Sequence, residues 1–137
     1  MRALLDQESP LASELRLPAL PSKLGLAREY VHEVAAEFGF DADHSYALAF
    51  AVNEAVTNAI RHGRPDAHGH IHLSVRADGE VLTVAVHDCG TFATSALGAS
   101  QTGESGRGFA LMARMMDAVQ LCVSPGSTTV RLSKALP

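Results

Sequence analysis

The segment from Asn53 to Gly63 constrains this chain most, because it sets two polar side chains into an apolar, alanine-rich stretch. Read as a helix, it places Glu54 and Asn58 one turn apart on the same face. The core-facing stripe of that helix would be Leu48, Val52, Ala55, Val56, Ala59 and Ile60. A carboxylate that accepts protons, beside an amide oxygen that binds hard cations, can support metal-assisted phosphoryl transfer. A helix with two polar residues on its solvent face is the alternative interpretation.

A second signal stands at the end of an apolar run that begins at Val84 and leads into Asp88, Cys89 and Gly90. The carboxylate at the end of this strand can accept a hydrogen bond from the exocyclic amine of a flat ring. A nearby residue without a side chain lets the ring lie against the backbone. An ordinary turn explains the same residues, because turns favour Asp and Gly.

A third signal is the glycine-dense segment from Gly103 to Gly108, which runs directly into an apolar stretch of helical character. Backbone amides exposed by glycine, together with the positive end of a helix, form a cradle for anions. A flexible linker capped by Ser105 is the alternative. The whole stretch from Thr91 to Arg107 lacks periodicity, and a loop of about 17 residues in a small domain usually serves as a lid or binding loop.

In this order, the three segments resemble the nucleotide-binding boxes of the Bergerat-type ATPase superfamily. That superfamily includes gyrase-type topoisomerases, ninety-kilodalton heat-shock chaperones, sensor histidine kinases and mismatch-repair ATPases. Two motifs are most similar to the anti-sigma-factor serine kinases of bacterial partner-switching systems. The first is Asn-Glu-Ala-Val-Thr-Asn-Ala, followed by His-Gly, and the second is the later Ser-Gly-Arg-Gly-Phe-x-Leu-Met. The resemblance extends from about Leu15 to Leu132. Phe92 stands where some branches carry a second glycine, which disfavours the chaperone, gyrase and histidine-kinase branches.

The resemblance implies that ATP lies between a helical layer and a glycine-rich lid, with Mg²⁺ bridging its phosphates. Asn58 would coordinate the Mg²⁺ through its side-chain oxygen, which suits an ion that keeps several water ligands. Asp88 would accept a hydrogen bond from the adenine amine, and Gly90 would permit the close approach of the ring.

The resemblance also implies which residues bind the phosphates and which one moves a proton. Gly106, Arg107 and Gly108 would bind the phosphates at the start of a helix. Glu54 would be the general base that takes a proton from a serine hydroxyl of an anti-sigma-factor antagonist. His62, one turn beyond the magnesium ligand, could touch a phosphate or order the magnesium shell, although stabilisation by the helix dipole explains a C-terminal histidine equally well.

On this basis the chain is expected to be an ATP-dependent protein serine kinase that also sequesters a sigma factor. A nucleotide-gated module that holds a partner protein without efficient transfer is the alternative, and Glu54 favours the kinase because a pure binder needs no base. A detached histidine-kinase catalytic domain ranks third, since the chain lacks the usual length and the second glycine. The implied partners are a sigma factor and its anti-sigma-factor antagonist, and a homodimer stays open because relatives commonly pair through sheet edges or helices.

Length and composition bound the number of domains, the class of ligand and the cellular compartment. The 137 residues are expected to form one domain, 1–137, with residues 1–12 as a flexible arm. A net charge of −4, with no concentrated patch among the 11 Lys and Arg, argues against nucleic-acid binding. The absence of a signal peptide and of any run near the roughly 20 apolar residues of a membrane span predicts a cytoplasmic protein. Cys89 and Cys122 are then expected to be buried free thiols.

Periodicity and turn residues predict three helices and about five strands. In chain order they are a strand over 14–18, a helix from Ser22 as its cap to Gly39, a helix from Asp41 or Asp43 to Gly63, strands over 70–76 and 81–87, a helix over 109–116, and strands over 119–123 and 128–132. This order predicts an α+β, two-layer sandwich with the helices on one face of a mixed, mostly antiparallel sheet. The resembled ATPases share this Bergerat fold.

Three histidines, His68, His70 and His72, alternate along the chain and would share one face of a strand. Such a cluster could bind a transition metal. However, no carboxylate or cysteine is expected nearby at ligand spacing, and His68 belongs to a turn. A solvated strand face is therefore the favoured interpretation.

Overall fold

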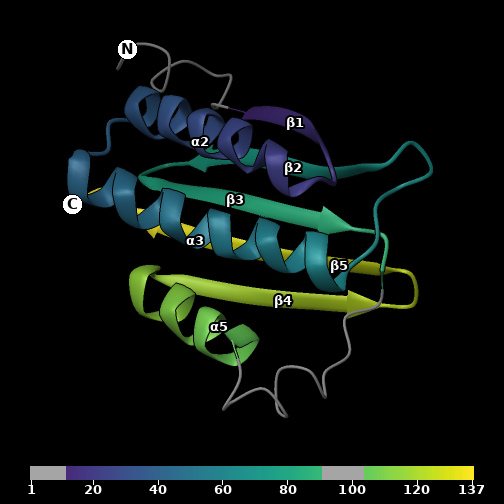
Figure 1. Ribbon diagram of the computed structural model, residues 1–137. Helices are drawn as coiled ribbons and strands as arrows, with labels where there is room; N and C mark the ends of the chain where they lie inside the picture. Colours follow the sequence, from purple (N-terminus) through teal and green to yellow (C-terminus); the bar gives the residue numbers. More distant parts are fainter. Residues whose placement is uncertain (1–11, 91–103) are drawn as a thin grey trace.

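The structure, a computed structural model, describes residues 12–90 and 104–137, with side chains described from Phe109 onward in the last helix. Within this part of the chain, five strands form one sheet and the helices cover one of its faces (Figure 1). The strands are β1 (Ala12–Pro18), β2 (His70–Asp78), β3 (Val81–Asp88), β4 (Ala118–Ser124) and β5 (Ser127–Ala135); the helices are the 3₁₀ turn η1 (Pro21–Lys23), α2 (Leu24–Phe38), α3 (Ala42–His62) and α5 (Glu104–Met115).

The sheet has the order β1-β2-β3-β5-β4, and each neighbouring pair of described strands is antiparallel. The predicted two-layer α+β fold is therefore confirmed, and the sheet contains no parallel pair within the described residues. Gly79 and Gly126 take positive φ values of 64° and 74° in the two hairpin turns, a conformation that glycine adopts without steric cost. Strand β3 lies at the centre of the sheet, so its last residue, Asp88, ends beneath the helical layer.

The core lies between the sheet and α3, where apolar side chains from both layers pack together. Alternation along β2 sends Ile71, Leu73 and Val75 into this core and leaves Ser74 and Arg76 exposed. The apolar stripe predicted on α3 is buried, apart from the half-buried last member; its buried members are Leu48, Val52, Ala55, Val56 and Ala59. Burial of one face leaves the other face of α3 available for Glu54 and Asn58.

The first helix starts differently from the prediction. Ser22 lies inside the 3₁₀ turn η1, and α2 begins at Leu24 with no side-chain hydrogen bond at its cap residue, Lys23. The predicted cap at Ser22 is therefore wrong. Pro21 explains the change, because its fixed φ suits the first position of a helical turn and shifts the helical conformation upstream of the serine.

The junction between α2 and α3 follows the predicted signals. Gly39 ends α2 in the left-handed region, with φ 109°, and its N–H donates to the carbonyls of Ala35 and Ala36. Asp41, rather than Asp43, caps α3, and its carboxylate accepts the backbone N–H of His44 at 2.8 Å. Local capping chemistry therefore sets both helix ends.

Helix α5 begins at Glu104, five residues before the predicted start at Phe109. Two glycines cost roughly 1 kcal/mol each in a helix and favoured a loop prediction, but α5 packs against α3 and β4, and tertiary packing outweighs that local preference. Residues 104–107 of the predicted lid are therefore helical. The rest of the lid, residues 91–103, and the predicted arm up to residue 11 lie outside the described residues.

Both cysteines are free thiols, as predicted, but they are not both buried. Cys122 is exposed because it lies on the outward-facing register of β4, which is an edge strand. Cys89 is half-buried beyond the end of β3. No helix in residues 12–90 and 104–137 is long and apolar enough to span a bilayer.

Candidate functional site

Asp88 is a buried ionisable residue at the end of β3, with only 4% of the residue exposed. Its Oδ1 accepts the backbone N–H of Gly90 at 2.7 Å and that of Arg64 at 3.2 Å. Burial raises the pKa of the Asp88 carboxyl above its ordinary value, although these two hydrogen bonds and His87 act in the opposite direction. A carboxylate held in this environment favours a ligand that brings a hydrogen-bond donor.

Two glycines pack directly against this carboxyl group. A Cβ on Gly63 would lie 2.5 Å from Asp88 Cγ, and a Cβ on Gly90 would lie 3.0 Å from the backbone nitrogen of Arg64. The carbonyl oxygen of Gly90 in turn accepts the hydroxyl of buried Thr128 at 2.7 Å. The fold therefore requires both glycines for its own packing around Asp88, independently of any ring that Gly90 admits.

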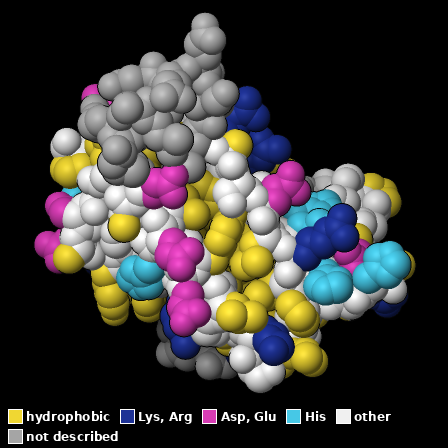
Figure 2. All heavy atoms as spheres, turned by 90° about the horizontal axis from the view of Figure 1, so that it is seen from above, with side chains coloured by type: hydrophobic (Ala, Val, Ile, Leu, Met, Phe, Trp, Pro, Cys, Tyr) yellow, Lys and Arg dark blue, Asp and Glu magenta, His cyan; other side chains and the backbone are white. Residues whose placement is uncertain are grey.

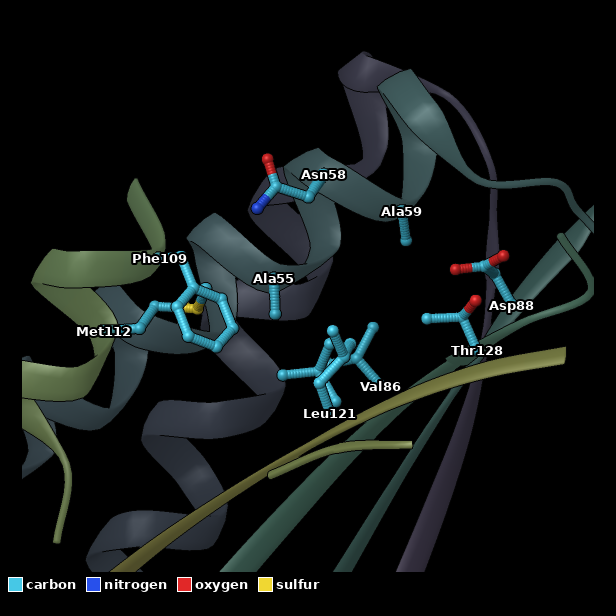
Figure 3. Close-up of a pocket in the computed structure, with 10 residues that line it drawn as sticks. Ala55, Asn58, Ala59, Val86, Asp88, Phe109, Met112, Leu121 and Thr128 are labelled. Atoms are coloured by element: carbon cyan, nitrogen blue, oxygen red, sulfur yellow. The ribbon is translucent and has the colours of Figure 1, made fainter. Parts of the chain in front are cut away.

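A cavity opens between the helical layer and the sheet beside Asp88 (Figure 3). It is lined by Ala55, Asn58, Ala59, Val86, Asp88, Phe109, Met112, Leu121, Thr128 and Val130. Asp88 and Thr128 form its polar end, and Phe109 and Met112 of α5 lie at the other side. The enclosed space of about 20 Å³ holds roughly one water. A purine base is much larger than this enclosed space.

A second, larger hollow of about 440 Å³ adjoins this cavity and opens to solvent. Its lining residues are His62, Gly63, Arg64, Cys89, Gly90 and Gly126. His62 is the last residue of α3 and is exposed. Gly90 and His62, which the sequence proposes for one site, thus lie at the same hollow.

The remaining proposed site residues lie on α3 and α5. Asn58 lines the cavity together with Asp88, and in Figure 3 it projects from α3 between Phe109 on one side and Asp88 on the other. Glu54 is half-buried on α3, about 6 Å before Asn58 along the helix axis. Gly106, within the first turn of α5, has one of the backbone N–H groups that a helix leaves without an internal partner.

Arg107 and Gly108 follow within the same helix, and α5 packs on α3. The side chain of Arg107 lies outside the described part of the structure. The backbone therefore brings the glycine-rich segment to the helix that carries Glu54 and Asn58.

Three residues at this site were missed from the sequence: Gly63, Arg64 and Thr128. Gly63 was interpreted as a helix stop and as part of the His-Gly motif, without a contact to Asp88. The contribution of Arg64 comes from its backbone N–H, which no side-chain pattern reveals. Thr128 had a usable signal, because it alternates in phase with Leu132, which is fully buried, and therefore points inward.

The histidine cluster also differs from its prediction. Asp66 folds back onto β2, and its Oδ2 lies 2.6 Å from Nε2 of His72. The expectation that no carboxylate stands nearby is therefore wrong, because a turn brings together residues six positions apart. Even so, no group of three His, Cys, Asp or Glu in the described ranges is arranged to hold a metal ion.

Known proteins with related sequences share almost the full length of this chain. Residues 17–134 match the model of the histidine kinase-like ATPase domain family. The anti-sigma F factor of Bacillus subtilis (strain 168) is 33% identical over 132 residues, which cover 89% of this chain and 90% of that protein. The serine-protein kinase RsbW of the same organism is 30% identical over 137 residues, covering 90% of this chain and 84% of the kinase.

Solved structures show the same fold at lower sequence identity. The RsbU and RsbW domains of Rv1364c from Mycobacterium tuberculosis superpose with a TM-score of 0.73 and 21% identity, over 92% of this chain and 32% of that one. A histidine kinase domain from Erythrobacter litoralis EL346 gives a TM-score of 0.57 and 16% identity, over 98% of this chain and 69% of the other. By fold, family model and sequence relatives, the chain belongs to the histidine kinase-like ATPase domain family and, within it, to the ATP-binding partner-switching regulators that include anti-sigma F factors and RsbW serine kinases.

Proposed function

We propose that this protein transfers the γ-phosphoryl group of ATP to a serine of an anti-sigma-factor antagonist and also sequesters a sigma factor in the cytoplasm. The observation that carries the proposal is the cavity that Asn58 and the buried carboxyl group of Asp88 line together. Relatives of this chain at about 30% identity are named as an anti-sigma factor and as a serine-protein kinase, which supports the same assignment.

Adenine recognition is assigned to Asp88. Its Oδ1 already accepts two backbone N–H groups, so that the carboxyl group is held in one orientation. Oδ2 takes part in neither bond and would accept the exocyclic amine of adenine. Guanine carries a carbonyl oxygen at the corresponding position, and two acceptors facing each other are unfavourable, so the site favours adenine.

The donor set around Asn58 fits a Mg²⁺ ion that is bound chiefly through the nucleotide. The other α3 residues of the cavity wall, Ala55 and Ala59, bring no competing ligand. Mg²⁺ prefers oxygen and keeps several waters, so one amide oxygen from Asn58 would be enough beside phosphate oxygens and water. When bound, the ion would neutralise phosphate charge. The helix N-terminus at Gly106, together with Arg107, Gly108 and His62, is assigned to the phosphates.

Glu54 is assigned as the general base. It would take the proton of the substrate serine as the serine oxygen bonds to the γ-phosphorus and the bond from that phosphorus to the ADP oxygen breaks. A positioned base contributes about 10²- to 10⁴-fold to such a reaction. The larger part of the acceleration comes from positioning and charge stabilisation at the phosphoryl group.

The proposal is tested first by calorimetric titration of the folded protein with Mg-ATP, Mg-ADP and Mg-GTP. We expect binding of both adenine nucleotides and much weaker binding of GTP. A pull-down from native extract with and without ATP, followed by intact-mass analysis, should then show a retained partner that gains one phosphoryl group. Absence of adenine-nucleotide binding contradicts the nucleotide site. A partner that is retained but never phosphorylated identifies a nucleotide-gated binding module instead.

A further inference from the structure

The link between α3 and β2 is bonded to the end of β3 through both backbone groups of Arg64. The N–H of Arg64 donates to Asp88 Oδ1 at 3.2 Å, and its carbonyl oxygen accepts the N–H of Cys89 at 2.8 Å. Gly63, immediately before it, packs against the same carboxyl group. The orientation of Asp88 therefore depends on where this link is held.

The far end of the link is held by Asp66. Its Oδ1 accepts the backbone N–H groups of His68 at 2.8 Å and His70 at 3.0 Å, and its own N–H donates to the carbonyl oxygen of His70 at 2.9 Å. Its Oδ2 lies 2.6 Å from His72 Nε2, and only 19% of the Asp66 side chain is exposed. We call this set of contacts between Asp66 and His68, His70 and His72 the Asp66 clasp. The His72 ring, and after it the N–H groups, hold the pKa of Asp66 well below its usual range, so these contacts favour the ionised carboxylate.

Pro65 makes the connection between these two points stiff. The proline ring locks its own φ, and its Cδ restricts Arg64 to extended conformations. Pro65 therefore leaves fewer free torsions in the link to absorb a displacement at Asp66 before it reaches the Arg64 N–H.

We propose that Asp66 is a positioning residue of the nucleotide site, which holds the link so that Gly63 and the Arg64 N–H seat the carboxyl group of Asp88. The proposal rests on the assignment of Asp88 to adenine. Asp66 is not among the residues that line the Asp88 cavity or the adjoining hollow, so it acts through Arg64. Figure 2 shows histidine side chains gathered beside a basic side chain at the end of the molecule where this turn lies.

A matched control exists at the other end of α3. Asp41 also accepts a backbone N–H, that of His44, and its Oδ1 lies 2.7 Å from His44 Nδ1. The two clasps thus share an aspartate, a backbone donor and a histidine ring. The 21 residues of α3 separate Asp41 from the nucleotide end by roughly 30 Å.

The first test compares Asp66→Ala with Asp41→Ala, both assayed well below their unfolding temperatures. With Asp66→Ala, the Kd and KM for Mg-ATP should rise about tenfold while kcat at saturating ATP stays close to that of the parent. With Asp41→Ala, the Kd should stay within about twofold, since distant sites act independently. An unchanged Kd in Asp66→Ala overturns the proposal, as does an equal loss in both variants. Failure of the parent to bind ATP would instead refute the adenine assignment.

The second test uses Asp66→Asn, which keeps an oxygen for the His68 and His70 N–H groups. His72 is faced by Asp66 from the turn, by His87 from β3 with ring centroids 6.3 Å apart, and by Arg16 from β1 in the sheet register. A protonated ring needs the carboxylate as its acceptor, whereas a neutral ring can accept from the asparagine amide.

Asp66→Asn therefore keeps the two backbone bonds and loses only the ionised contact to His72, so its Kd for Mg-ATP should rise less than that of Asp66→Ala. A Kd for Asp66→Asn as high as that of Asp66→Ala contradicts the role of the two backbone bonds. This variant retains both backbone bonds of the turn and so keeps the test usable if Asp66→Ala does not fold.

Discussion

An aspartate lies at each end of helix α3, and the pKa values of the two carboxyl groups are shifted in opposite directions. At the N-terminus, Asp41 is 57% exposed, and hydrogen bonds from His44 lower the pKa of its carboxyl group. At the C-terminus, Asp88 is almost fully buried beside Gly63, and desolvation raises the pKa of its carboxyl group. The first carboxylate stabilises the helix it caps, whereas the second is held in a state that a bound donor would improve. The same type of side chain thus serves helix stability at Asp41 and the proposed ligand site at Asp88.

The largest expected effect comes from Glu54→Gln, in the C-terminal half of α3 that carries the proposed nucleotide site. Removal of the base should lower phosphate transfer to the partner at least about 10²-fold, while the affinity for ATP stays within a few fold. Transfer is measured by intact mass of the partner and affinity by calorimetry. The control is Glu33→Gln on the exposed face of α2. Equal transfer rates in the parent and Glu54→Gln would show that Glu54 is not the base.

Next in size is Asp88→Asn, which removes the buried charge and places an amide donor toward the amine of adenine. A buried mismatch of this kind costs about 1–3 kcal/mol, or roughly 5- to 150-fold in Kd for Mg-ATP. Asp78→Asn, at the exposed β2–β3 hairpin, is the control and should leave the Kd unchanged. An Asp88→Asn protein that binds ATP like the parent would remove Asp88 from the adenine site.

Gly63→Ala and Gly39→Ala compare the C-terminal ends of α3 and α2. The new methyl group at Gly63 would lie 2.5–2.6 Å from three atoms of the Asp88 carboxyl group, so Asp88 must move and the Kd for ATP should rise about tenfold. At Gly39, with φ 109°, the nearest atom is 3.8 Å away, so alanine should lower stability by about 1 kcal/mol without changing the Kd. Thermal unfolding and calorimetry separate the two results, and equal effects on the Kd would contradict the comparison.

The smallest effects concern the pH dependence of stability. The lowered pKa of Asp41 means that its contribution is present above the ordinary value of 3.8 and is lost as the pH falls below it. The raised pKa of Asp88 acts in the opposite sense, because stability declines as the pH rises above 3.8 and the buried carboxyl group ionises. In thermal unfolding from about pH 3 to pH 7, Asp88→Asn should remove the second trend and Asp41→Asn the first, and each trend should amount to a few degrees or less in Tm. Identical pH profiles of stability for both variants would contradict the opposite pKa shifts of Asp41 and Asp88.

Much of the fold could be predicted because its signals are local. The apolar period of α3, the capping aspartate Asp41 and the left-handed Gly39 each act within one helical turn. The hairpin turns carry glycine where a positive φ is needed. The errors arose where packing outweighs local preference, as at the start of α5, or where a proline redirects a helix start, as at Ser22.

The amino-acid sequence by itself determined the order of the elements, the apolar stripe of α3 and the candidates Glu54, Asn58, Asp88 and Gly90, because periodicity and motif spacing are properties of neighbouring residues. Only the tertiary structure decided what surrounds Asp88. The Arg64 N–H reaches it from 24 positions away, and Thr128 bonds to the Gly90 carbonyl across 38 positions. Such contacts depend on strand order and register, which a central strand acquires only when both of its neighbours are in place.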